Sequence, residues 1–235
     1  MKLSVVIPAY NEEKRIEQTA EILVGFLPTV TEDFELIIVS DGSTDTTLEK
    51  IQALAGKNDK IKALGYTQNK GKGGAVRTGM LASTGDIVLF TDTDLAYGTE
   101  VIKRAVETFE QTGADLVVGS RNLGADSYEE YSFLRKLMSK TYLTLISIVL
   151  GFKLSDSQCG FKCFTGKAAH DVFGECTIDS FAFDLEALLK AQKKGYKIAE
   201  MSVKIINHDD NVTKVRIIRD TFKMLNDIRK IKKHL

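Results

Sequence analysis

The stretch Ile87-Val88-Leu89-Phe90-Thr91-Asp92-Thr93-Asp94-Leu95 decides the fold class. Its first four residues are apolar β-formers, a run typical of a strand buried on both faces. Two carboxylates, Asp92 and Asp94, follow where that strand should end. At the carboxyl end of a parallel strand, alternate side chains can point together into the crevice where open α/β sheets bind ligands. The spacing therefore predicts either a pair of carboxylates that share one divalent cation or a polar loop that caps the next helix.

Strands and helices alternate on both sides of this stretch. Apolar runs typical of buried strands span 3–7, 36–39, 61–66 and 116–118, with amphipathic helical segments between them. This alternation predicts a mostly parallel sheet with helices on both faces. The second half is less regular, with helices expected over 128–150, 183–194 and 215–235 and a strand over 198–206.

Composition narrows the classes of protein that fit. The 235 residues suffice for one substantial α/β domain, and 32 Lys and Arg balance 32 Asp and Glu, so no overall field favours nucleic acid. The chain runs straight into a strand without a signal peptide, which predicts a reducing compartment and three buried thiols rather than a zinc site. The longest apolar run, 143–152, is about half of the roughly 20 residues that span a bilayer.

Polar residues follow each expected strand, on the edge where ligands bind. They are Tyr10-Asn11-Glu12, Asp41-Gly42-Ser43, residues 69–74, Asp92 with Asp94, and Ser120-Arg121. Two common nucleotide fingerprints are missing, because the first turn lacks G-x-G-x-x-G and residues 71–74 lack the G-x₄-G-K-[ST] phosphate loop. We therefore expect a different mode of ligand binding at this edge.

The ordered set of these motifs resembles the family 2 nucleotide-sugar glycosyltransferases, and specifically the polyprenyl-phosphate (dolichyl-phosphate) sugar synthases. The matching stretches are 5–12, 38–45, 69–77, 85–86, 91–95, 118–121, 156–162 and 183–186. The stretch Gln158-Cys159-Gly160-Phe161-Lys162 is the most telling for the polyprenyl-phosphate branch. The resemblance implies a single-domain GT-A-like, Rossmann-type α/β sandwich over 1–235. It would comprise a nucleotide-binding half (1–120), an acceptor half (121–214) and an amphipathic C-terminal helix (215–235).

The resemblance also implies roles for residues of the donor site. Pro8, Tyr10 and Glu12 would line the nucleotide site, Asp41 would pair with an N–H of the base, and the turn carrying Lys72 and Arg77 would pass under the ribose and diphosphate. Asp92 would lie near the diphosphate, and Asp94 would be the principal ligand of Mg²⁺ or Mn²⁺, with Asp92 beside it. Two departures matter: many relatives have a second aspartate where Ser40 stands, and mannose-transferring relatives often have a further metal-side ligand where Ala96 stands.

The acceptor is inferred from chemistry. A phosphate monoester is mostly ionised near pH 7, since its second pKa is about 6, so its attack requires cations more than a base. Arg121, Arg135 and Lys214 are the candidate acceptor-phosphate ligands, and Arg121 and Lys214 join Asp92 and Asp94 as predicted catalytic residues. We therefore expect metal-dependent, inverting transfer of a hexose or N-acetylhexosamine from a UDP- or GDP-sugar to a polyprenyl (dolichyl) phosphate.

Two other functions stay open. A glycosyltransferase acting on a sugar or protein hydroxyl would need Asp184 or Glu186 as a base. A non-catalytic nucleotide-sugar-binding protein would bind the donor without turnover, which the intact Asp92 and Asp94 pair disfavours.

The C-terminal segment predicts a peripheral attachment to a membrane. Apolar residues at helical spacing are flanked by basic ones: Val215, Ile218, Phe222, Leu225, Ile228 and Ile231 beside Arg216, Arg219, Lys223, Arg229, Lys230, Lys232 and Lys233. Such a helix can lie in the interface of an anionic membrane, here expected to be the cytoplasmic face. The alternative packs the apolar face against the catalytic domain or a second subunit, so a membrane-protein partner or a homo-oligomer stays open.

Overall fold

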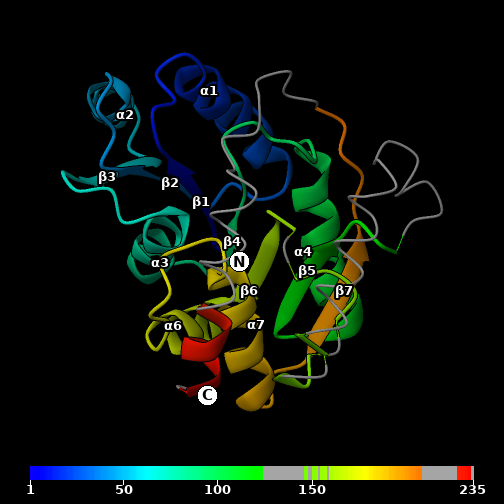
Figure 1. Cartoon of the computed structure of the whole chain (residues 1–235). Coiled ribbons are helices and arrows are strands. Elements are labelled where there is room, and N and C mark those ends of the chain that lie inside the picture. Colours follow the sequence, from blue (N-terminus) through cyan, green and yellow to red (C-terminus); the bar gives the residue numbers. More distant parts are fainter. Residues whose placement is uncertain (124–145, 148–149, 153, 158, 208–226, 234–235) are drawn as a thin grey trace.

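The computed structural model describes residues 1–123, 146–147, 150–152, 154–157, 159–207 and 227–233 (Figure 1). Seven strands of this part form one sheet: β1 (Leu3–Ala9), β2 (Phe34–Asp41), β3 (Ile61–Tyr66), β4 (Ile87–Phe90), β5 (Leu116–Ser120), β6 (Lys162–Thr165) and β7 (Ile198–Ser202). The helices are α1 (Ile16–Phe26), η1 (Leu27–Thr29), α2 (Thr47–Lys57), α3 (Lys72–Ala82), α4 (Glu100–Thr112), α6 (Gly166–Phe173) and α7 (Phe183–Lys193). The predicted α/β architecture is confirmed.

The sheet has the strand order β3-β2-β1-β4-β6-β5-β7 and is parallel except for β6. In the antiparallel pairing of β4 with β6, Phe90 lies opposite Lys162. The start of β6 therefore meets the end of β4, and the loop before β6 reaches the edge at which the parallel strands end. This reversal adds the segment around Cys159 and Gly160 to the predicted ligand edge.

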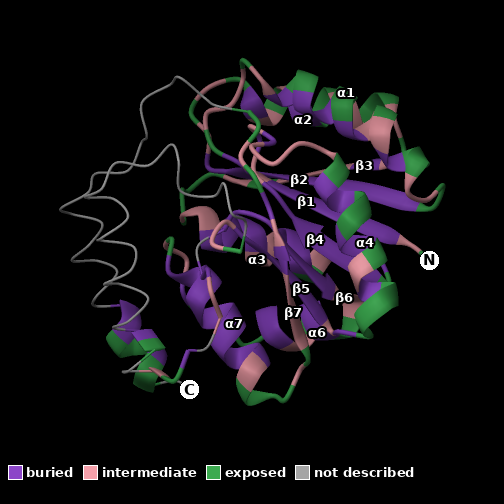
Figure 2. Cartoon of the chain, turned by 90° about the vertical axis from the view of Figure 1, so that its right-hand side faces the viewer, coloured by how far each residue is buried: buried purple, intermediate pink, exposed green. Residues whose placement is uncertain are grey.

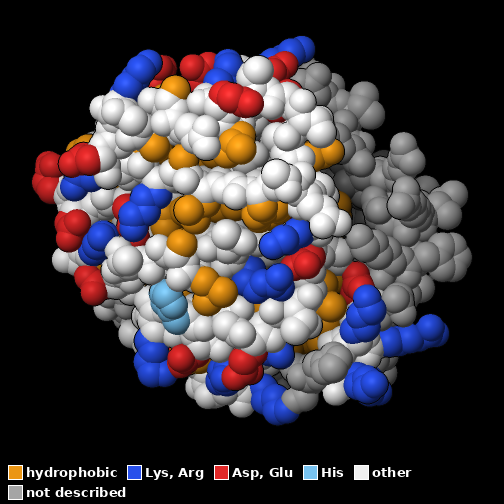
Figure 3. All heavy atoms as spheres, turned by 90° about the vertical axis from the view of Figure 1, so that its left-hand side faces the viewer, with side chains coloured by type: hydrophobic (Ala, Val, Ile, Leu, Met, Phe, Trp, Pro, Cys, Tyr) orange, Lys and Arg blue, Asp and Glu red, His pale blue; other side chains and the backbone are white. Residues whose placement is uncertain are grey.

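Helices cover both faces of the sheet because its strands are apolar on both sides. Val5 and Ile7 belong to a core packed under α1, α2 and α4, whereas Val6 between them belongs to a core under α3, α6 and α7. Figure 2 shows the strands buried between helices whose outer sides are exposed. On the face of the molecule that carries α2, β3, α3 and α6, acidic and basic side chains are interspersed with hydrophobic ones (Figure 3).

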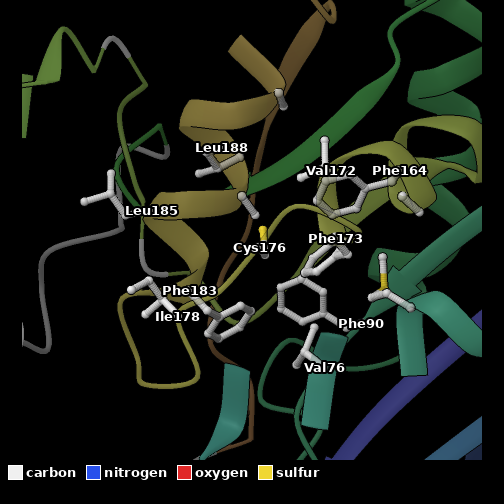
Figure 4. Close-up of a cluster of buried hydrophobic side chains, with 14 of the residues drawn as sticks. Val76, Phe90, Phe164, Val172, Phe173, Cys176, Ile178, Phe183, Leu185 and Leu188 are labelled. Carbon is white, nitrogen blue, oxygen red and sulfur yellow. The ribbon is translucent and has the colours of Figure 1, made fainter. Parts of the chain in front are cut away.

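The core under α3, α6 and α7 is rich in aromatic rings (Figure 4). The rings of Phe90 and Phe183 lie 5.6 Å apart, and those of Phe164 and Phe173 lie 5.3 Å apart in an edge-to-face arrangement. Such pairs contribute about 0.5–1.5 kcal/mol beyond the area they bury. The Phe90–Phe183 pair joins the end of β4 to the start of α7, so it fixes two elements that carry charged residues of the site.

One expectation about an individual element needs correction. The strand expected over 198–206 ends at Ser202, because the chain then leaves β5 and Ile206 donates its backbone N–H to the carbonyl of Ala96. Asn11 precedes α1 by several residues, and its side-chain oxygen accepts the backbone N–H of Thr44. The predicted buried thiols are confirmed, since all three cysteines are free and buried.

The described part of the C-terminal segment, 227–233, is helical. Ile228 and Ile231, expected on a membrane-facing surface, are instead buried in the core under α7, because that core offers them an apolar surface. Residues 215–226, and all but a few residues of the helix expected over 128–150, lie outside the described residues. In the part that is described, no helix combines the length and the hydropathy needed to cross a membrane.

Glu35, near the start of β2, joins residues at the end of the sheet opposite the ligand edge. Its carboxylate makes the stability of the fold depend on pH. Its buried carboxylate lies 2.5 Å from the Lys62 ammonium and accepts hydrogen bonds from Ser4 and Thr84. Burial alone would raise the pKa of Glu35, but these partners outweigh it and lower that pKa to about 2.

Glu35→Gln is therefore expected to lower the free energy of unfolding by about 2–3 kcal/mol at neutral pH. A lowered folded-state pKa stabilises the fold above the unfolded pKa, and this contribution is lost as pH falls toward the folded value. Urea denaturation near pH 7 and near pH 3 measures the free energy of unfolding of the wild type and of the variant. The difference between the two proteins should be smaller at pH 3. An equal difference in the free energy of unfolding at both pH values would contradict a lowered pKa of Glu35 in the folded protein.

Candidate active site

The polar residues predicted for the ligand edge do meet there. Thr91, Thr93 and Leu95 are buried, whereas Asp92 and Asp94 between them are half-buried. This alternation places both carboxylates on the accessible side of the segment after β4, as the spacing predicted. The carboxyl ends of β1, β2 and β5 lie beside it in the same sheet.

A lysine from α3 faces this pair of aspartates. The Lys72 ammonium lies 2.6 Å from a carboxylate oxygen of Asp92. Burial would lower the pKa of Lys72, but the charges of Asp92 and Asp184 outweigh it and raise that pKa. Burial and the charge of Asp92 also raise the pKa of Asp94, so a second cation near Asp94 would relieve a real repulsion.

The two aspartates fit a hard divalent cation. Among the residues that the structure describes, no group of three or more His, Cys, Asp and Glu side chains could enclose a metal ion. A cation held by Asp94 and Asp92 would therefore take its other ligands from phosphate and water, which is how Mg²⁺ is commonly bound in proteins. The donor set thus suits a metal that arrives with a diphosphate.

The turn after Asp94 is held in a strained shape. Leu95 has φ +46°, a conformation that costs a leucine about 1–3 kcal/mol. Its carbonyl accepts the N–H of Gly98 and the side-chain amide of Asn207, and the carbonyl of Ala96 accepts the N–H of Ile206. The segment after β7 therefore fixes the backbone beside Asp94. The sequence alone does not indicate this role for Asn207, because no local pattern links it to a turn 112 residues away.

Asp41 is buried and holds the loop before α3. Its carboxylate accepts the hydroxyl of Tyr66 at 2.6 Å, the side-chain amide of Asn69 at 2.9 Å and the backbone N–H groups of Lys70 and Gly71, both at 3.0 Å. The resemblance implies that Asp41 contacts the base of a nucleotide; the structure shows that its carboxylate holds the loop over residues 69–71.

Asp41→Ala is therefore expected to weaken nucleotide binding by about tenfold to a hundredfold and also to loosen residues 69–71, because several donors lose one buried acceptor. Hydrogen exchange of the Lys70 and Gly71 amides, measured beside UDP and GDP affinity, checks both effects. Tyr66→Phe is the matched control, since it removes one of these donors and leaves the carboxylate. Unchanged exchange in the Asp41 variant would contradict the role in the loop.

Arg77, another predicted donor-site residue, lies within α3. Arg77 lies 2.7 Å from a carboxylate oxygen of Asp179 and donates to the carbonyl of Cys176. Gly73 donates its N–H to the carbonyl of Asp179, and a Cβ there would stand 2.6 Å from that of Phe183. The start of α3 is thus docked on the loop before α7, which brings Lys72 close to Asp184.

The remaining predicted donor-site residues follow β1 or belong to it. Pro8 and Glu12 are half-buried, and Tyr10 is 41% exposed. The backbone N–H of Glu12 donates to Thr47 at the start of α2. These three residues lie at the same edge as Asp92, as expected.

Arg121 directly follows β5 and is held by an aspartate. Its Nε and Nη2 donate to the two carboxylate oxygens of Asp156 at 2.7 and 3.1 Å. Burial would lower the pKa of the guanidinium, but the hydrogen bonds and charge of Asp156 outweigh it and raise that pKa. Arg121 is thus a fixed cation at the ligand edge. Arg135 and Lys214, predicted beside it, lie outside the described residues.

The two carboxylates considered as bases for a hydroxyl acceptor are otherwise engaged. Asp184 is buried and lies 2.7 Å from the ammonium of Lys162. Glu186 is 1% exposed and accepts the N–H groups of Thr177 and Ile178. Both positions turn inward because α7 packs its first turn against the core, so the structure disfavours either residue as a general base.

Comparison with known proteins shows which family the sequence matches. The sequence profile of the family described as Glycosyl transferase family 2 matches residues 4–173. A dolichyl-phosphate beta-glucosyltransferase of Dictyostelium discoideum is 32% identical, with 98% of this chain and 73% of that protein covered. The human protein of the same name is 33% identical, with 86% of this chain and 66% of that protein covered.

Other similar proteins differ more in length or sequence. The glycosyltransferase AglD of Haloferax volcanii is 33% identical over 97% of this chain, which spans only 36% of that relative. Glucosyl-3-phosphoglycerate synthase from Mycobacterium tuberculosis, solved with UDP, superposes with a TM-score of 0.68 at 21% identity, covering 99% of this chain and 80% of that one. The same enzyme has been solved with Mn²⁺ and UDP-glucose (TM-score 0.65, 20% identity, the same coverage). This likeness shows that the fold is shared.

Proposed function

Because the chain belongs to glycosyl transferase family 2, we propose that it transfers a hexose from a nucleotide-sugar to a polyprenyl (dolichyl) phosphate with inversion. The observation that carries the proposal is the edge at which Asp92 and Asp94 face Lys72, with the fixed cation Arg121 on the same edge. Asp92, Asp94 and Lys72 suit a metal-bound diphosphate, and Arg121 suits a second phosphate.

The sugar and the nucleotide are the finer part of the proposal. The relatives named dolichyl-phosphate beta-glucosyltransferases favour glucose as the sugar. UDP-glucose is therefore the first donor to test, with GDP-sugars as the alternative. We keep the division into a donor half (1–120), an acceptor half (121–214) and a C-terminal helix (215–235) as part of the same proposal.

The chemistry needs no protein base. An oxygen of the acceptor phosphate, already ionised, attacks the anomeric carbon from the side opposite the diphosphate. The bond from that carbon to the diphosphate oxygen breaks, its electrons leave with the nucleoside diphosphate, and the configuration inverts. Asp94 and Asp92 would hold a divalent cation, which when bound acts as a Lewis acid for the charge on the leaving group. Arg121 orients the acceptor, and Lys72 lies beside the diphosphate.

Exposed apolar side chains near this edge support a lipid acceptor. Leu123 after β5, Phe181 before α7 and Ile206 after β7 are 49%, 51% and 60% exposed. We place the approach of the polyprenyl chain, and contact with a membrane surface, along this rim, since large exposed apolar side chains gather at interaction sites.

The test is transfer of label from UDP-glucose to dolichyl phosphate in anionic vesicles, with Mg²⁺ or Mn²⁺ present. We expect label in the organic phase, in a product that mild acid cleaves as it does a glycosyl phosphate. Label that stays on a water-soluble acceptor would overturn the lipid acceptor. Donor binding without any turnover would instead favour a non-catalytic protein.

A further inference from the structure

One buried ion pair is not used by the chemistry described above. Lys162, the first residue of β6, is 0% exposed and lies in the core that contains the ring of Phe90. Its ammonium is 2.7 Å from a carboxylate oxygen of Asp184 and donates to the carbonyl of Cys159 at 2.6 Å. A fully buried lysine is rare in proteins and is found almost only when it is paired, as it is here.

Stability does not explain why this pair is there. Removing two charges from water costs several kcal/mol per ion, and replacing a buried ion pair by uncharged residues of similar volume is often neutral or stabilising. The neighbours of Lys162 in the sheet, Phe90 and Val118, are apolar. A methionine would therefore suit the position equally well by packing alone, so the charge calls for another explanation.

The pair lies at the inner end of a line of alternating charges that ends at the donor site. Asp184 lies close enough to Lys72 for each charge to shift the pKa of the other group. The contact of Gly73 with Phe183 brings their chain neighbours Lys72 and Asp184 together. Lys72 in turn lies 2.6 Å from Asp92. The order Lys162, Asp184, Lys72, Asp92 therefore runs from the core to the accessible edge, with each residue on a different element.

We propose that the Lys162–Asp184 ion pair is a positioning element of the donor site, which keeps Lys72 directed toward Asp92 and the donor diphosphate. The proposal rests on the proposed function, because Lys72 and Asp92 matter only if a diphosphate binds there. Because Lys162 neutralises most of the charge of Asp184, Asp184 attracts Lys72 only weakly. Lys72 therefore keeps its contact with Asp92. Without Lys162, Asp184 would be a buried carboxylate with Lys72 as its neighbouring cation, and Lys72 would turn inward, away from Asp92.

The test compares Lys162→Met, Asp184→Asn and the double variant, using thermal unfolding, calorimetric binding of UDP with Mg²⁺, and steady-state kinetics with UDP-glucose. Both single variants should unfold at lower temperature, because each leaves one charge without its partner. The double variant should regain most of the unfolding temperature. Because the double variant also lacks the Asp184 carboxylate that attracts Lys72, Lys72 should be less well fixed beside Asp92. This variant should therefore still bind UDP about tenfold more weakly and raise the KM for UDP-glucose by a similar factor, with the KM for the acceptor unchanged.

Glu35→Gln is the matched control, since it removes another buried carboxylate–lysine pair at the far edge of the sheet. It should lower the unfolding temperature without changing UDP affinity, because a purely structural change reduces the amount of folded protein and not its KM. A double variant with wild-type UDP affinity and KM would overturn the positioning role alone. A wild-type chain that binds neither UDP nor GDP would overturn the proposed function together with it.

Discussion

Asp94→Asn should reduce sugar transfer by about a thousandfold or more, the largest effect that we expect of any single substitution. Asp94 is the half-buried carboxylate beside Asp92, and both would hold the cation that stabilises the leaving diphosphate. The amide keeps the shape of the side chain but loses the negative charge, so the affinity for a divalent cation should fall with the activity. The measurements are kcat/KM for UDP-glucose and the dependence of UDP binding on Mg²⁺ or Mn²⁺.

The same variant should not unfold more easily than the wild type. Burial and the charge of Asp92 raise the pKa of Asp94, which means that the folded protein disfavours its ionised form. Neutralising the residue should therefore leave the unfolding temperature unchanged or slightly raised at neutral pH. Loss of activity with retained stability would separate a metal ligand from a structural residue. Full activity, or UDP binding that still depends on metal to the same degree, would remove Asp94 from the site.

The first half of the chain could be predicted from sequence because its signals are local. The run Ile87–Phe90 is apolar at every position, and a strand buried on both faces must be so. The alternation of Asp92 and Asp94 with buried neighbours likewise follows from the period of an extended chain. Each of these predictions needed only residues adjacent in sequence, and the structure confirms them.

The polar contacts that complete the site depend on residues far apart in the chain. Asp156 lies 35 residues from Arg121, and Asp184 lies 22 residues from Lys162. The direction of β6 decides that the segment around Cys159 and Gly160 reaches the ligand edge, and a short strand sequence does not indicate its direction. Asp184 was therefore considered as a base when its surroundings make it a partner of Lys162, and no periodicity could have shown this.

Arg121→Ala should lower kcat/KM for the lipid phosphate by about a hundredfold to a thousandfold, because a fixed guanidinium is well suited to phosphate oxygens. Asp156 accepts hydrogen bonds from two N–H groups of the Arg121 guanidinium and so fixes the plane of that group. We expect the other guanidinium N–H groups to bind the acceptor phosphate. The KM for UDP-glucose should stay close to its wild-type value. Kinetics with each substrate varied in turn measure this split.

Arg121→Lys and Asp156→Asn separate the charge of Arg121 from its geometry. The lysine keeps one positive charge but cannot form the two-pronged contact, so it should recover only part of the activity. Asp156→Asn keeps the guanidinium and weakens its orientation, so it should raise the acceptor KM less than Arg121→Ala does. If Arg121→Ala raises the KM of donor and acceptor equally, Arg121 contributes to binding of both substrates at the ligand edge and is not specific for the acceptor phosphate. If neither KM changes and only the unfolding temperature falls, the Arg121–Asp156 pair is structural, and the acceptor phosphate must be bound by other cations of the chain.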